Sequence, residues 1–215
     1  MPAALKPTRT DREKLFFTRA SWADCWPNHE VICFSDPALQ IDSKLNGAWF
    51  IHPEYDVIQA LSQVVQDISF ELGIEEKRIV VYGSSLGGFG ALMLAACFKS
   101  VRAVAEVPQL EFRLWQRRAV ADVEKYIIGR PISEFRTEFP ERVSVLHRFI
   151  KCGHIPQFTI ITNGSDFRIK EQRNFMKWVR QSSLSKDGMN LLIETDQTAG
   201  HAVLPKHYLV PFVQP

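Results

Sequence analysis

A serine, an aspartate and a histidine occur in this chain in settings that suit nucleophilic catalysis. Ser85 lies in the run GSSLGGFGAL, Asp166 lies in TNGSDFR and His201 lies in TAGHAVL. A serine hydroxyl is a poor nucleophile at neutral pH unless a nearby base, commonly histidine, takes its proton. An acidic side chain then keeps the imidazole in the correct tautomer and stabilises its charged form. Together the three residue types predict acyl transfer through a covalent intermediate.

Two adjacent serines compete for the role of nucleophile. Ser85, unlike Ser84, has glycine both two residues before it and two residues after it, in the pattern G-x-S-x-G. A side chain at either glycine would collide with the neighbouring strand or helix when the turn is tight. We therefore predict that Ser85 is the nucleophile and that the backbone N–H of Leu86, at the start of a helix, holds the developing oxyanion.

The pattern G-x-S-x-G predicts a catalytic serine only when it lies between a strand and a helix. A continuous apolar run at residues 78–82 predicts a buried strand, and residues 86–98 are rich in alanine and leucine, as a buried helix would be. A tight turn that uses glycine only for packing remains an alternative. A phosphate-binding loop is a weaker one, because the pattern G-x-x-x-x-G-K-[ST] is absent.

The run GSSLGGFGAL resembles the nucleophile elbow of the α/β-hydrolase superfamily, in particular its esterase-like members. The resemblance implies a mostly parallel sheet and a serine followed by an acid after a later strand and a histidine after the last strand. It also implies a second oxyanion donor from an early loop, here residues 18–22, where the backbone N–H of Arg19 or Ala20 is our choice. The histidine-glycine motif of many lipases is absent from that loop.

The acid and the base follow from this order. His201 comes just after the last predicted strand, whereas His29 and His52 precede the elbow. Asp166 follows the strand predicted at residues 158–162, although it would also suit a helix N-cap. Glu106, after the preceding strand, is the alternative acid, and Asp196 is a weaker one because it is close in sequence to His201.

The remaining elements must bring these residues together. Apolar runs predict about six strands, and helical periodicity is clearest at residues 53–72 and 169–184, with a short closing helix near 203–212. Alternating strands and helices indicate a parallel sheet covered on both faces. The predicted strands are residues 14–18, 30–34, 78–82, 101–107, 158–162 and 190–194.

Residues 108–157 are too long for a plain connection and predict a helical, cap-like insertion between the fourth and fifth strands. Its run EFRLWQRR offers Trp115 as a stacking platform for a substrate. The arginines of that run, Arg113, Arg117 and Arg118, are more simply a solvated helix face. Near the carboxyl ends of the strands, Asp36, Trp49 and His52 are further candidates for the mouth of a site.

Composition narrows the function class. The 215 residues predict one domain, and 26 basic against 24 acidic residues give no reason to expect nucleic-acid binding. No apolar stretch has the length of a membrane span, and neither an export signal nor a metal or organic cofactor is implied. The four cysteines lack paired spacing, which favours free thiols and a cytoplasmic location.

The sequence thus predicts an ester hydrolase with a small-molecule or saccharide-linked substrate. An acyltransferase that uses the same residues, or a binding protein that keeps the fold without the chemistry, are the alternatives. The acyl group, the leaving group and the oligomeric state are not encoded in any pattern that we recognise.

Overall fold

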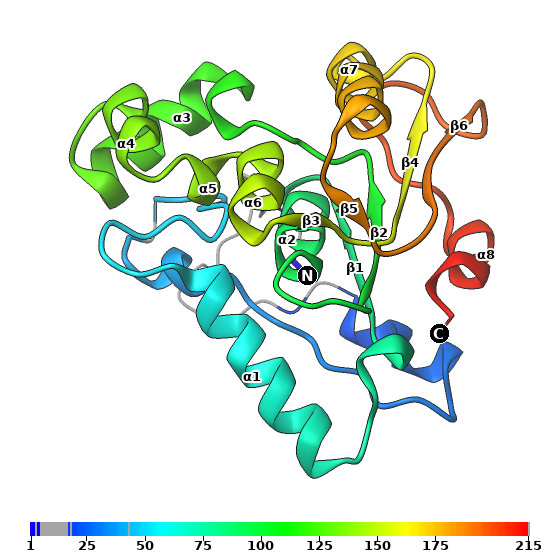
Figure 1. Cartoon of the computed structure of the whole chain (residues 1–215). Helices are drawn as coiled ribbons and strands as arrows, with labels where there is room; N and C mark the ends of the chain where they lie inside the picture. Colours follow the sequence, from blue (N-terminus) through cyan, green and yellow to red (C-terminus); the bar gives the residue numbers. More distant parts are fainter. Residues whose placement is uncertain (3, 5–16, 18, 43, 215) are drawn as a thin grey trace.

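Four parallel strands form the main sheet of the computed structural model, which describes residues 1–2, 4, 17, 19–42 and 44–214 (Figure 1). Their order in the sheet is β1-β2-β4-β6, and every neighbouring pair is parallel. The α/β class with a mainly parallel sheet is therefore confirmed. The strands of this sheet are β1 (Val80–Ser84), β2 (Arg102–Glu106), β4 (Phe158–Asn163) and β6 (Asn190–Thr195). Two short strands, β3 (His154–Ile155) and β5 (Ser185–Lys186), form a separate parallel ladder.

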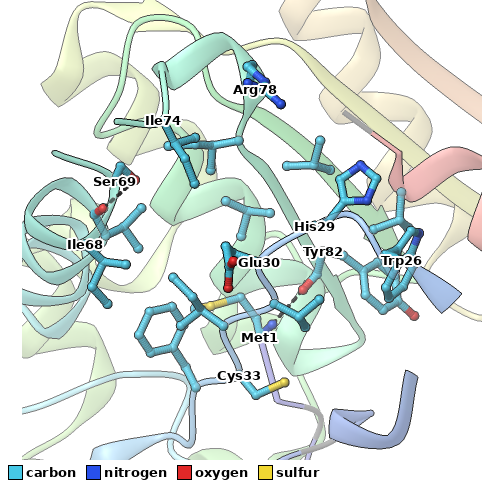
Figure 2. A pocket seen from close by; sticks show the side chains of 18 of the residues that line it. Met1, Trp26, His29, Glu30, Cys33, Ile68, Ser69, Ile74, Arg78 and Tyr82 are labelled. Atoms are coloured by element: carbon cyan, nitrogen blue, oxygen red, sulfur yellow. Dashed lines mark hydrogen bonds between the residues drawn. The ribbon is translucent and has the colours of Figure 1, made fainter. Parts of the chain in front are cut away.

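The predicted count of about six strands is wrong for the main sheet as the described residues form it. Of the first predicted strand, residues 14–16 and 18 lie outside the described residues. Residues 30–34 form no strand. This segment and residues 78–82 both line a cavity of about 300 Å³ (Figure 2). A strand pairs only with a neighbour about 4.8 Å away, and residues 30–34 have no such ladder in the described structure.

Helices cover the sheet much as the periodicity predicted. Asp56 caps α1, its carboxylate accepting the N–H of Gln59, so this helix begins a few residues later than the predicted start at residue 53. Every residue of α2 is buried, because α2 packs against β1, β2, α1 and α6. The helices outside the insertion are α1 (Val57–Glu71), α2 (Leu86–Ala95), α7 (Ile169–Gln181) and α8 (Lys206–Leu209). None of the helices within the described ranges is long and apolar enough to cross a bilayer.

The chain between β2 and β4 is the predicted helical insertion. It contains α3 (Arg117–Val123), which continues into a π-helical turn at Glu124–Ile128, then α4 (Ile132–Glu138), α5 (Pro140–Val143) and α6 (Val145–Cys152). Figure 1 shows α3 and α4 extending away from the sheet, while α6 returns to it beside α2.

Side-chain alternation along the strands separates two cores. The main core lies on the face covered by α2, where Ala103, Ala105 and Phe158 pack under α2 and the insertion. A smaller core on the other face joins Val104 and Ile161 to Leu204 and Leu209 from the C-terminal segment. Because successive strand residues point to opposite faces, this division follows directly from the period of two. The carboxyl ends of the strands lie between the two layers, where the predicted site residues are found.

Candidate active site

Ser85 occupies the sharp turn between β1 and α2. Its backbone angles are φ 54° and ψ −117°, a region that residues other than glycine rarely adopt. Its N–H donates to the Glu106 carbonyl on β2 at 2.8 Å, which anchors the turn to the sheet. The turn is possible because a Cβ on Gly83 would stand 2.0 Å from the carbonyl oxygen of Gly87.

We expect Gly83→Ala to destabilise the fold by more than the usual ~1–3 kcal/mol of an overpacked site, because the clash is with backbone that cannot rotate away. Gly164→Ala is a matched control, since a Cβ at Gly164 meets nothing within 4 Å. Urea unfolding of both variants measures the difference. Equal midpoints would show that the turn opens without strain.

The structure brings Ser85, His201 and Asp166 into one chain of hydrogen bonds. The Ser85 Oγ is 2.9 Å from the His201 Nε2, and the His201 Nδ1 is 2.9 Å from the Asp166 Oδ2. Asp166 is 1% exposed, whereas the side chain of His201 is 19% exposed. A carboxylate at Nδ1 favours the tautomer that carries its proton there, which leaves Nε2 free to accept the serine proton.

The loop that carries His201 is held by residues that sequence reasoning missed. The Asn163 Nδ2 donates to the Gly200 carbonyl at 2.6 Å, and the Gly200 N–H donates to the Ser165 Oγ at 2.8 Å. Gly200 has φ 67°, which turns the chain sharply just before the histidine. Asn163 ends β4 and Ser165 directly precedes Asp166, so one loop positions both the acid and the base. The only sequence feature that could have pointed to Asn163 and Ser165 is that they come just before Asp166 in the chain.

The alternative acids have other partners. Glu106 accepts the Tyr82 hydroxyl at 2.9 Å and the N–H of Leu204, with Arg19 at 3.7 Å, so it links the sheet to the C-terminal segment. Burial raises the pKa of Glu106 above its usual range. Asp196 is exposed and accepts the side-chain amide of its neighbour Gln197 at 3.3 Å. The helix-cap alternative for Asp166 is wrong, because Arg168 is the N-cap residue of α7. The Asp166 Oδ1 instead accepts the Arg168 N–H at 2.6 Å in the turn before the helix.

The predicted oxyanion donors lie in two places. Leu86 is the first residue of α2 and directly follows the serine, as predicted. Arg19 lies beside the elbow, but its guanidinium donates to the Ser84 hydroxyl at 2.8 Å and stacks on Trp22. The N–H of Ala20 donates to the Phe17 carbonyl at 3.5 Å. A backbone donor from Arg19 or Ala20 therefore stays a prediction.

Two aromatic rings flank His201. The ring centroid of Trp115 lies 5.1 Å from that of His201, and the ring of Phe167 lies 5.2 Å away. The two aromatic rings also stack on each other at 5.4 Å. Phe167 is 58% exposed, so Trp115 and Phe167 form an apolar shelf next to the histidine.

Other sequence candidates lie elsewhere or act differently. Arg113, Arg117 and Arg118 are exposed, in keeping with a solvated face. Asp36 is buried, and its carboxylate accepts the N–H groups of Ala48 and Phe50. His52 lies just before α1, where its Nδ1 accepts two backbone N–H groups.

The cavity in Figure 2 is separate from the hydrogen-bonded chain of Ser85, His201 and Asp166. Its lining residues, among them Met1, His29 and Tyr82, include none of these three.

Gln109 is a further residue that sequence reasoning missed. Its Nε2 donates to the Ser85 Oγ at 2.7 Å and lies 3.3 Å from the His201 Nε2. A glutamine three residues beyond a strand belongs to no motif that we used, so only the fold reveals its place.

The chain is similar to known proteins in its structure, although no match is found in its sequence. The sequence matches no family model, and no curated protein is similar to it in sequence. Among solved structures, a capsule O-acetyltransferase of Neisseria meningitidis serogroup A superposes with a TM-score of 0.66 at 16% identity, over 93% of this chain and 78% of that one. An S-formylglutathione hydrolase from Agrobacterium tumefaciens gives a TM-score of 0.51 at 14% identity, over 78% of this chain and 59% of that chain.

A puromycin hydrolase gives a TM-score of 0.53 at 16% identity over 77% of this chain, which spans only 25% of that larger protein. At such low identity these likenesses concern the fold. The parallel sheet and the helices that cover it agree with them. The chain therefore has the α/β-hydrolase fold.

Proposed function

We propose that this protein is a serine hydrolase that cleaves carboxylic esters through an acyl-enzyme. The observation that carries the proposal is the continuous hydrogen-bonded chain from the Ser85 Oγ through His201 to the buried Asp166. A serine held at a strained turn at the start of a helix adds to it, because backbone strain of this kind gathers at functional sites.

The reaction uses each group in turn. The Ser85 Oγ attacks the ester carbonyl carbon while its proton passes to the His201 Nε2, and the Leu86 N–H donates to the oxygen that becomes negative. His201 then gives the proton to the leaving alkoxide as the carbon–oxygen bond breaks. In the second half, water attacks the acyl group with His201 again acting as the base, and Ser85 is restored.

The apolar shelf indicates which substrates are accommodated. Trp115 and Phe167 border the histidine that protonates the leaving group, so they would contact the leaving alcohol. An aromatic surface of this kind suits an apolar group or the apolar face of a sugar ring. Small acyl esters of such alcohols are the substrates that we would try first.

Fluorophosphonate labelling followed by peptide mass spectrometry tests the proposal. We expect the label on Ser85, lost in Ser85→Ala and strongly reduced in His201→Ala. Ser84→Ala is the matched control, because the Ser84 hydroxyl accepts from Arg19 instead, and it should label at nearly the normal rate. A folded wild-type protein that takes no label would favour a binding protein over an enzyme.

Acyl transfer to an alcohol is the second candidate. The structure with a TM-score of 0.66 over 93% of this chain is described as a capsule O-acetyltransferase. The same residues serve both reactions, since only the acceptor of the acyl group differs. Incubation with an activated acetyl ester, with and without a sugar or alcohol acceptor, separates them: an acetylated acceptor in excess of free acetate would favour transfer.

A further inference from the structure

We propose that the side-chain amide of Gln109 is the second oxyanion donor of this site, a role that rests on the function proposed above. Gln109 is 0% exposed, and its Nε2 is 2.7 Å from the Ser85 Oγ, the atom that would form the new bond. It is thus a neutral donor already aimed at the reacting centre before any substrate enters.

The orientation of the amide is set by a second hydrogen bond. The Trp49 Nε1 lies 3.1 Å from the Gln109 Oε1. An indole nitrogen donates and never accepts, so it must face the amide oxygen. The NH₂ group of Gln109 is consequently forced towards Ser85. Trp49 is itself buried, with its ring packed 4.9 Å from that of Phe112.

The backbone on both sides of Gln109 is fixed by α7. The Gln172 side-chain amide donates to the Pro108 carbonyl at 3.1 Å. The Glu171 carboxylate accepts the N–H groups of Leu110 at 3.3 Å and Glu111 at 2.9 Å. Burial raises the pKa of Glu171, although its two backbone donors and Arg168 oppose that effect. The amide is therefore held in place at its backbone and at its tip.

Backbone strain is concentrated around the same residue. Five described residues other than glycine have positive φ, and four of these are Ser85 at 54°, Trp49 at 52°, Phe50 at 57° and Val107 at 41°. For a β-branched residue such as Val107 a positive φ is a genuine outlier. The strained Trp49–Phe50 turn is maintained by Asp36, whose carboxylate accepts N–H groups at 3.2 Å and 3.1 Å. Strain at Trp49, and at Val107 two residues before Gln109, supports a functional role for the geometry of the Trp49–Gln109 hydrogen bond.

The chemistry explains why a donor is needed there. When the Ser85 Oγ bonds to the carbonyl carbon, the electron pair of the C=O bond moves onto its oxygen, which lies two bonds from Oγ. The proton of Oγ leaves for the His201 Nε2, and a lone pair of Oγ forms the new bond to carbon, so Oγ becomes a weaker acceptor than the oxyanion. An N–H of the Gln109 amide, held in the same place, then donates to the oxyanion together with the Leu86 N–H, and no proton needs to leave the amide.

Gln109→Met and Gln109→Glu test the assignment. The first removes the donor at similar volume, and the second keeps an acceptor for Trp49 but places an oxygen against Ser85. We expect either change to lower the second-order rate of fluorophosphonate labelling at Ser85 by about 100- to 1,000-fold. Exposed Gln63→Met is the matched control and should label normally. Thermal melting establishes that each variant is folded.

A second probe separates oxyanion binding from a purely structural role. A matched phosphonothioate offers P=S in place of P=O, and sulfur accepts hydrogen bonds weakly. The wild type should therefore prefer the oxygen probe, and both Gln109 variants should lose most of that preference. Trp49→Phe, which frees the amide to rotate, should fall between wild type and the Gln109 variants.

The labelling experiment distinguishes a failure of the Gln109 assignment from a failure of the proposed function. Labelling that depends on Ser85 and His201 but is unchanged in rate and in oxygen preference by both Gln109 variants would overturn the assignment and leave the proposed function standing. A wild type that is not labelled at all would overturn the proposed function, and the assignment with it.

Discussion

Asp166→Asn is expected to lower the rate of Ser85 acylation by about 10,000-fold while leaving the fold intact. The buried Asp166 Oδ2 accepts from the His201 Nδ1 at 2.9 Å, and its Oδ1 accepts the Arg168 N–H at 2.6 Å. An asparagine can keep the Arg168 bond only by turning its NH₂ group to the histidine. His201 would then accept at Nδ1 and carry its proton on Nε2, where it cannot take the proton of Ser85.

Glu106→Gln is the control that decides between the two buried acids. Glu106 links Tyr82 to Leu204, so this variant should acylate within about tenfold of wild type. Stopped-flow or timed labelling of both variants measures the rates. If Glu106→Gln proved the slower of the two, Glu106 would be the acid and the Asp166 contact only structural.

Asp56→Ala should have the largest effect on stability among single changes outside the active site. Arg148 is 1% exposed and its guanidinium is 2.7 Å from the Asp56 carboxylate. Removing one partner of a buried ion pair leaves an uncompensated charge, at a cost of about 3–5 kcal/mol. Asp56→Ala also removes the N-cap of α1, because the Asp56 carboxylate accepts the Gln59 N–H. The measured loss of stability includes both effects. Urea unfolding at pH 7 measures it, with exposed Asp67→Ala as the control.

The difference in unfolding free energy between wild type and Asp56→Ala should depend on pH in one direction only. Burial alone would raise the pKa of Asp56, but the hydrogen bond and the charge of Arg148 outweigh it, and the pKa is lowered from 3.8. A carboxylate with a lowered pKa stabilises the fold fully above its unfolded value, and this contribution is lost as the pH falls through the folded value. The gap between wild type and Asp56→Ala should stay constant from pH 7 to about pH 5 and narrow below pH 4. A gap that widened in acid would contradict the ion pair.

Local patterns were enough to predict the elbow, and long-range contacts account for what was missed. Ser85, Asp166 and His201 each stand in a recognisable setting beside a strand, and the parallel sheet brings those settings to one edge. Gln109 and Trp49 have no local signature, because their roles arise from a contact between residues 60 positions apart.

The prediction of a strand at residues 30–34 is wrong, and the reason is again a contact that the local sequence does not encode. The apolar composition of these residues is real, but Val31 and Ile32 are exposed and the segment borders a cavity beside β1. An apolar composition indicates that a segment is suited to a buried strand. A hydrogen-bonded ladder also needs an adjacent strand about 4.8 Å away, and the composition of one segment does not predict that. The second oxyanion donor was sought in an early loop because the resemblance placed it there, and the buried amide of Gln109 offers another source.

The strained backbone of Trp49, Phe50 and Val107 has a consequence for evolution and for engineering. Each such backbone conformation costs about 1–3 kcal/mol, but Trp49 and Phe50 are buried, and truncating a buried aromatic side chain costs about 3–5 kcal/mol. Glycine at either position would relieve the strain and still lower the stability of the fold. Replacement of Trp49 would also remove the indole that orients Gln109. Selection for resistance to heat and selection for turnover should therefore both keep the aromatic residues at positions 49 and 50, despite the strain.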